Sequence, residues 1–191
     1  YQDKFQKRFS LQVTGEYNIL NCLTCIALCD FYGLSLDTIQ NGLSAFSGAA
    51  RRMEYKGEFH GARVYDDYAH HPTEVRATAK GILMKTFHES WVVFECHSYS
   101  RFVTYLKEFT ESLSLFDHII IADIYAARET NSFGAKEDDL VQLLKEKQKD
   151  AVHISDYEEI KTYLEKRVLK NDLIITMGAG NITRLAEILV K

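Results

Sequence analysis

Apolar residues recur at helical spacing near the beginning of the chain. In residues 18–32 they stand three and four positions apart, which predicts a helix, and Gly33 predicts its end. A second stretch of this kind, residues 37–46, follows Ser35, a residue type that is common at helix N-caps. The pattern changes at residues 47–52, so we expect a boundary between two parts of the chain there.

Short apolar runs and amphipathic stretches alternate in the rest of the chain. The runs are rich in Val and Ile and have no polar face, which is typical of strands covered on both sides of a sheet. The expected strands are 54–60, 62–65, 91–95, 118–123, 151–154 and 173–177, and the expected helices are 73–87, 100–115, 137–149, 157–169 and 181–190. This alternation predicts an α/β fold: a Rossmann-like, mainly parallel sheet with helices on both faces, preceded by a short helical segment.

Composition and charge narrow the class of protein. The 191 residues are 46% hydrophobic and 26% charged, which is typical of a folded globular protein and argues against disorder. A net charge of −4 gives no basic field, so we expect no nucleic-acid partner. The apolar runs are far shorter than the roughly 20 residues of a membrane span, and the first residues lack a signal core. We therefore expect a cytoplasmic protein without membrane insertion.

Three of the four cysteines, Cys22, Cys25 and Cys29, lie on one stripe of the first predicted helix. A zinc site would need a second pair in a matching loop, and Cys96 stands alone in the sequence. We interpret the cysteines as small buried apolar residues under reducing conditions and expect no metal site.

Polar residues gather where the predicted strands end. In an open parallel sheet, ligands bind beyond the carboxyl ends of the strands. The residues that follow the predicted strands include acids, histidines, arginines and glycines: residues 66–72, residues 96–101, Asp123, Tyr125, Arg128, Glu129 and residues 178–181. Ordinary turn residues occupy the opposite edge. The sequence therefore predicts a functional site at the carboxyl edge of the sheet.

Each part of this cluster also has a structural interpretation. One of Asp66 and Asp67 is expected to cap the following helix, yet two acids beside two histidines exceed what capping requires. A zinc interpretation lacks the sequential spacing of a metal motif, so substrate binding is favoured. The stretch Gly178-Ala179-Gly180 resembles half of a dinucleotide fingerprint, but it follows the last strand and Thr183 replaces the third glycine. A tight turn before a helix is favoured there, with amides that can meet an anion.

Five segments, in order along nearly the whole chain, resemble the Mur ligases. They read GEYNILN at 15–21, RRME at 51–54, DDYAHHPTE at 66–74, HSYSR at 97–101 and GAGN at 178–181. The DDYAHHPTE segment is highly specific. Within the family, the resemblance is closest to the branch that adds L-alanine to UDP-N-acetylmuramate. It implies an ATP-dependent ligase of peptidoglycan synthesis that uses ATP and Mg and forms an acyl phosphate.

The resemblance also implies a domain assignment. Family members have a domain for the UDP-sugar, a central ATPase domain and a carboxy-terminal domain that presents the amino acid. Residues 1–50 resemble the end of the central ATP-binding domain, and residues 51–191 resemble the carboxy-terminal domain. The chain contains no GxxxxGK[ST] phosphate loop, and the magnesium ligands of the family lie outside it. We expect it to be inactive alone and to act with the amino-terminal and central domains of the same protein.

Three positions match ATP-binding residues of the family. Asn21 resembles the asparagine that meets adenine, Arg52 the arginine that reaches the phosphates, and Asp67 the aspartate that holds the ribose. The chemistry suits these roles, since an amide can bind a base edge, a guanidinium a phosphate and a carboxylate two hydroxyls.

A second group of positions matches the part of the family's site that receives the amino acid and the acyl group. The residues are His70 or His71, together with His97 and Arg101. For Arg101, the alternative is a surface ion pair with Glu95 or Glu108.

The sequence departs from the family pattern at three places. Tyr17 replaces a histidine, Glu95-Cys96 replaces glutamine-proline, and Ser98 stands where an arginine is usual. The loss of that cation weakens the expected grip on a carboxylate and leaves the identity of the amino acid open.

Other functions are weighed against this one. The muropeptide-recycling ligase of the same family shares the DDxAHHPT loop, and a stand-alone nucleotide- or anion-binding module is a second alternative. A nicotinamide oxidoreductase is disfavoured because the first strand lacks the glycine fingerprint.

Overall fold

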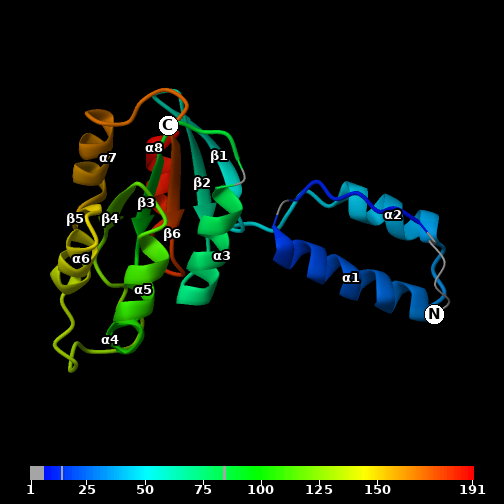
Figure 1. Ribbon diagram of the computed structural model, residues 1–191, viewed down its shortest axis with the longest axis horizontal. Helices are drawn as coiled ribbons and strands as arrows, with labels where there is room; N and C mark the ends of the chain where they lie inside the picture. The colour runs from blue at the N-terminus through cyan, green and yellow to red at the C-terminus, as the bar shows by residue number, and fades with distance from the viewer. Residues whose placement is uncertain (1–6, 14, 84) are drawn as a thin grey trace. The chain divides into compact units, whose positions relative to one another are not determined.

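The computed structural model describes residues 7–13, 15–83 and 85–191, and the chain divides into two units, one ending at Ala49 and the other beginning at Ala50 (Figure 1). Two predictions concern residues outside this range. The expected absence of a signal core involves residues 1–6, and the predicted helix 73–87 includes residue 84. None of the helices in the described part of the chain has the length and apolarity that a bilayer span requires.

Two helices make up the first unit. Helix α1 (Glu16–Phe31) ends before Gly33, which has a φ of 77°, and α2 (Leu36–Ala45) begins after Ser35, whose hydroxyl accepts from the Thr38 amide at 3.2 Å. Both predicted helices and the Ser35 cap are confirmed. Cys22, Ile39 and Leu43 form the buried core of this unit.

The expectation that all four cysteines are buried is wrong for Cys25. Cys22 and Cys96 are buried, but Cys25 is exposed. The face of α1 that packs in the small core carries Cys22, Ile26 and Cys29, spaced four and three residues apart. Cys25, three residues from Cys22 and four from Cys29, lies at the border of this stripe and is exposed to solvent.

The second unit is built on a six-stranded sheet with the order β1-β2-β6-β3-β4-β5. The strands are β1 (Glu54–Phe59), β2 (Ala62–Asp67), β3 (Ser90–Phe94), β4 (His118–Ile121), β5 (Asp150–His153) and β6 (Leu173–Met177). Strands β2 to β6 are mutually parallel, and β1 pairs antiparallel with β2. The two-residue turn His60-Gly61 has positive φ at both positions, which suits a hairpin. The predicted mainly parallel sheet is confirmed.

Helices cover both faces of this sheet. They are α3 (Pro72–Ile82), α4 (Tyr99–Thr104), α5 (Leu106–Leu113), α6 (Glu137–Glu146), α7 (Tyr157–Glu165) and α8 (Thr183–Leu189). Alternate residues of β3 enter different cores: Val92 and Phe94 pack with α3, α5 and α6, whereas Trp91 and Val93 pack with α7 and α8. Burial on both faces explains why the strands have no polar side.

Several helices differ in extent from the prediction, and contacts with distant residues lie where they stop or break. The predicted helix 100–115 is interrupted at Tyr105, where φ is −113° and ψ is 22°, and the Tyr105 ring packs on His71. The predicted helix 73–87 ends at Ile82, and the His88 amide donates instead to Asn171. Similarly, the predicted helix 157–169 ends at Glu165, and the Leu169 amide donates to Asp172.

Candidate functional site

The predicted gathering of polar residues at the carboxyl edge of the sheet is present. Backbone hydrogen bonds continue beyond the strands and join their loops: the Gly178 amide donates to Asp67, the Glu95 amide to Met177, and the Tyr125 amide to Cys96. The loops after β2, β3, β4 and β6 therefore form a connected edge, and the side chains they carry are held close together.

Asp66 and Asp67, at the end of β2, are both buried. Asp66 accepts from Arg51 Nε at 3.0 Å and from Thr176 Oγ1 at 2.7 Å. Asp67 is 2% exposed and accepts from the amides of Ala69 at 2.8 Å and Met53 at 3.0 Å. Burial raises the pKa of Asp67, and these donors oppose the rise. The expectation that one of the two acids caps the next helix is wrong, because α3 begins only at Pro72.

Arg52 lies in a turn whose two flanking residues are left-handed. Arg51 has a φ of 56° and Met53 a φ of 51°, conformations that cost energy for residues other than glycine. Glu54 accepts from the Arg51 amide at 2.8 Å, and Asp67 accepts from the Met53 amide. The Arg51 guanidinium also donates to the Gly178 carbonyl at 2.7 Å. These bonds hold the turn in place.

The Arg52 side chain extends from this turn toward solvent. It is 45% exposed, lies 3.6 Å from a Glu74 carboxylate oxygen and sits 5.8 Å from the centre of the Tyr68 ring. An exposed guanidinium on a firmly held turn can approach a phosphate with little rearrangement.

The two adjacent histidines have different environments. His71 is the N-cap of α3: its Nδ1 accepts from the Thr73 amide at 3.3 Å, and Glu74 accepts from the His71 amide in return. The His70 ring, by contrast, lies 6.3 Å from the His97 ring, and its Nδ1 is 2.9 Å from the Tyr68 carbonyl. His70 therefore contributes to the edge, and His71 has a structural role as a cap.

His97 and Arg101 lie together beyond β3. The His97 ring stacks on Tyr125 with centroids 5.3 Å apart, and Arg101 Nη1 lies 3.4 Å from His97 Nδ1. Arg101 also donates to the His97 carbonyl. It forms an ion pair with neither Glu95 nor Glu108, both of which the structure describes, so the surface-pair alternative is not supported.

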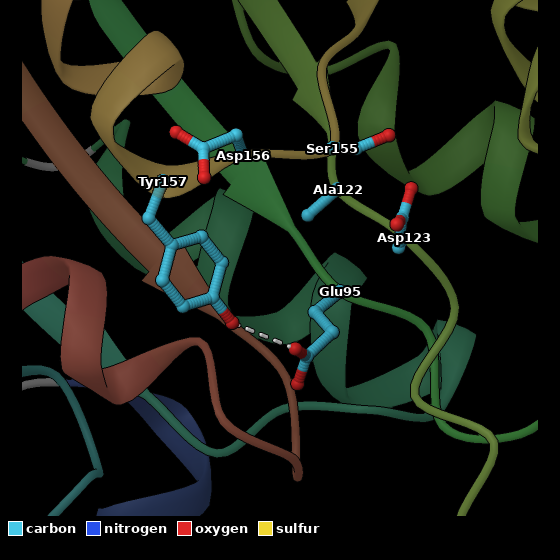
Figure 2. A pocket seen from close by; sticks show the side chains of 6 residues that line it. All are labelled: Glu95, Ala122, Asp123, Ser155, Asp156 and Tyr157. Atoms are coloured by element: carbon cyan, nitrogen blue, oxygen red, sulfur yellow. Dashed lines mark hydrogen bonds between the residues drawn. The ribbon is translucent and has the colours of Figure 1, made fainter.

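Glu95 lines a small pocket between the loops that follow β3, β4 and β5, of about 230 Å³ (Figure 2). The Tyr157 hydroxyl donates to Glu95 at 3.0 Å, and the other carboxylate oxygen accepts from the Ile182 amide at 3.3 Å. Burial raises the pKa of Glu95. A Cβ on Gly180 would lie 2.1 Å from a Glu95 carboxylate oxygen and 2.6 Å from Tyr125 Cγ, so a larger residue would displace these side chains. The turn 178–180 packs on an internal carboxylate, which supports its interpretation as a tight turn.

Two groups of side chains have a metal-ligand composition in the described ranges. One is His88, Glu89 and Asp172 at the amino edge, and the other is Asp123, Glu137 and His153 at the carboxyl edge. Both are already hydrogen-bonded, His88 to Asp172 at 2.9 Å and His153 to Asp123 at 2.8 Å. The sequence does not predict either group, because each includes at least one residue that is distant from the others along the chain.

The predicted site residues divide between the two units. Asn21 lies on α1 in the first unit with an exposed side chain. In the second unit, the edge brings together His70, His97 and Arg101, with Asp67 and the turn of Arg52 at the end of β2. Sequence reasoning missed Arg51 and Thr176 as partners of Asp66. A threonine inside an otherwise apolar strand is a signal that could have indicated the second of them.

Known proteins resemble this chain over almost its whole length. The family model described as "Mur ligase, glutamate ligase domain" matches residues 51–180. UDP-N-acetylmuramate–L-alanine ligase of Agathobacter rectalis is 44% identical over 95% of this chain, and that of Caldicellulosiruptor bescii is 41% identical over 99%. The chain spans 39% and 42% of the lengths of these relatives.

Solved structures agree with this similarity. The UDP-N-acetylmuramate-alanine ligase of Thermotoga maritima covers 98% of this chain with a TM-score of 0.81 and 26% identity, and the chain covers 40% of that protein. A murein peptide ligase from Psychrobacter arcticus shares the fold at 24% identity, with a TM-score of 0.68. Since the family model matches well over half of the residues, this chain belongs to the Mur ligase family.

Proposed function

We propose that this chain is the carboxy-terminal part of an ATP-dependent, cytoplasmic ligase that adds L-alanine to UDP-N-acetylmuramate in peptidoglycan synthesis. The observation that carries the proposal is the carboxyl edge of the sheet, where the family's motif residues Arg52, His70, His97 and Arg101 lie within one connected set of loops. The names of the relatives that are 44% and 41% identical support the choice of substrates.

The charges along the edge suit two ligands. At the end of β2, the exposed Arg52 would bind the ATP phosphates. Asp67 uses three of its roughly four acceptor positions for donors of the chain, and the fourth would accept from a ribose hydroxyl. Beyond β3, Arg101 would bind the carboxylate of L-alanine, with His97 and His70 beside it. The carboxylate of UDP-N-acetylmuramate would take the γ-phosphoryl group of ATP and release ADP, and the amine of L-alanine would then displace phosphate. Mg would be held by residues that the family places outside this chain.

Residues 1–50 are proposed to be the end of the central ATP-binding domain, with Asn21 facing adenine. The apolar surface of α1 supports this assignment. Ile19, Leu20, Leu23 and Leu28 are each more than half exposed. Such a concentration of exposed apolar side chains on one helix is unusual for an independent domain and is expected where the rest of a domain packs.

The direct test is an assay of the full-length protein that contains this chain. With UDP-N-acetylmuramate, ATP and magnesium, ADP release should depend on an added amino acid, and L-alanine should give a higher kcat/KM than glycine or L-serine. Activity only with a muropeptide in place of L-alanine would identify a recycling ligase and overturn the proposal.

A further inference from the structure

One carboxylate joins the loop after β3 to the loop after β4. Glu129 Oε1 accepts from the hydroxyls of Ser98 and Ser100, each at 2.6 Å, and Oε2 accepts from the Ser100 amide at 2.9 Å. All three partners are donors, so the carboxylate satisfies them without a donor of its own. Hydrogen bonds from Ser100 and Ser98 lower the pKa of Glu129 to about 2, so it is ionised at neutral pH.

These contacts show what the serine at position 98 does. Ser98 is 7% exposed and its hydroxyl is bonded to Glu129, so it does not face a ligand at the edge. The Ser100 amide belongs to the first turn of α4, where backbone N–H groups have no helical acceptor. Ser98, the N-cap residue, makes no capping bond to this turn. Glu129 supplies that acceptor from another loop.

The residues held by Glu129 lie between the two that we assign to the amino acid. His97 precedes Ser98, and Arg101 follows Ser100 and donates back to the His97 carbonyl. The same two loops also meet where the His97 ring stacks on Tyr125. A shift of the Ser98–Ser100 segment would therefore move both His97 and Arg101 relative to the edge.

We propose that Glu129 is a positioning residue for the amino acid: by holding Ser98 and Ser100, it fixes His97 and Arg101 in the orientation that binds the incoming carboxylate. This inference rests on the proposed function.

The test compares KM values for the two small substrates in the full-length enzyme. In Glu129→Gln, a neutral amide with one accepting oxygen replaces a charged group with two, so we expect KM for L-alanine to rise about tenfold while KM for ATP stays within about twofold. Glu146→Gln is the matched control, since it makes the same change at an exposed residue at the end of α6. Both of its KM values should equal those of the wild type.

A second variant separates positioning from folding. Ser100→Ala removes one hydroxyl donor and keeps the amide bond to Glu129, so it should raise KM for L-alanine about threefold with an unchanged melting temperature. If Glu129 acts through Ser100, the effects of Glu129→Gln and Ser100→Ala should be less than additive in the double variant.

The outcomes distinguish the two claims. A wild-type enzyme without L-alanine-dependent activity would overturn the proposed function. An active wild type whose Glu129→Gln and Ser100→Ala variants keep the wild-type KM for L-alanine would overturn only the role of Glu129. If Glu129→Gln does not fold, the KM of Ser100→Ala decides the question alone.

Discussion

Asp67 accepts hydrogen bonds from Ala69, Met53 and Thr78 while its side chain is almost inaccessible to solvent. At the scale of single residues, the side chains of the family's motifs therefore stabilise the fold in addition to any contact with a ligand. His71 caps α3, and Arg51 bonds both Asp66 and the Gly178 carbonyl. Arg52 and the His70–His97–Arg101 group present polar atoms toward the edge, and Asp67 keeps one acceptor position beside them.

Replacing Asp67 by asparagine should destabilise the fold. An amide group offers one acceptor oxygen, so an NH₂ group would face one of the backbone donors of Met53 and Ala69. We expect a loss of about 1–3 kcal/mol in the free energy of unfolding, measured by urea denaturation of the 191-residue chain. Asp123→Asn, whose side chain is 61% exposed, is the control. Equal midpoints for the two variants would contradict the internal role of Asp67.

The amino edge of the sheet shows how elements are held together at the end opposite to the site. His118, at the start of β4, lies between Glu89 before β3, at 2.9 Å, and Asp150 at the start of β5, at 2.7 Å. Its ring stacks on Trp91 at 3.9 Å. Burial opposes a charge on this imidazole, but the two carboxylates outweigh it and raise the pKa of His118.

This arrangement makes stability depend on pH. Because the pKa is raised in the folded state, the stabilisation is complete below the unfolded value of about 6.5 and is lost as the pH rises through the folded pKa. We expect the wild-type chain to lose more stability than His118→Asn between about pH 6 and pH 9, by urea denaturation. Parallel pH profiles of the two proteins would show that the ion pairs contribute nothing.

The sequence predicts elements well where local signals decide them. The strand 173–177 follows from an apolar run, and the N-cap of α2 follows from Ser35. It fails where distant groups intervene, as at Tyr105, where the packing of its ring on His71 accompanies the break between α4 and α5. The clamp between Glu129 and Ser98 spans 31 positions and has no local pattern that would reveal it.

On the scale of the whole molecule, the chain carries only part of what ligation requires. Under the proposed function, its carboxyl edge would supply Arg52 and Arg101. Phosphoryl transfer also depends on a cradle of backbone amides and cations, and no GxxxxGK[ST] loop occurs in the sequence. We expect the purified 191-residue chain to release no phosphate from ATP, with or without L-alanine and UDP-N-acetylmuramate. Steady phosphate release by the clean chain, measured beside the full-length protein, would contradict this expectation.

In the proposed function, one edge of the sheet binds both ATP and the amino acid, at separate points. The most direct measurement is therefore the pair of KM values in two variants of the full-length enzyme, Arg52→Ala and Arg101→Lys. Arg52→Ala should raise KM for ATP about tenfold or more and leave that for L-alanine nearly unchanged. Arg101→Lys should do the reverse, because a lysine cannot bind a carboxylate in the forked geometry of arginine. Wild-type constants in both variants, or equal changes in both constants, would contradict the account.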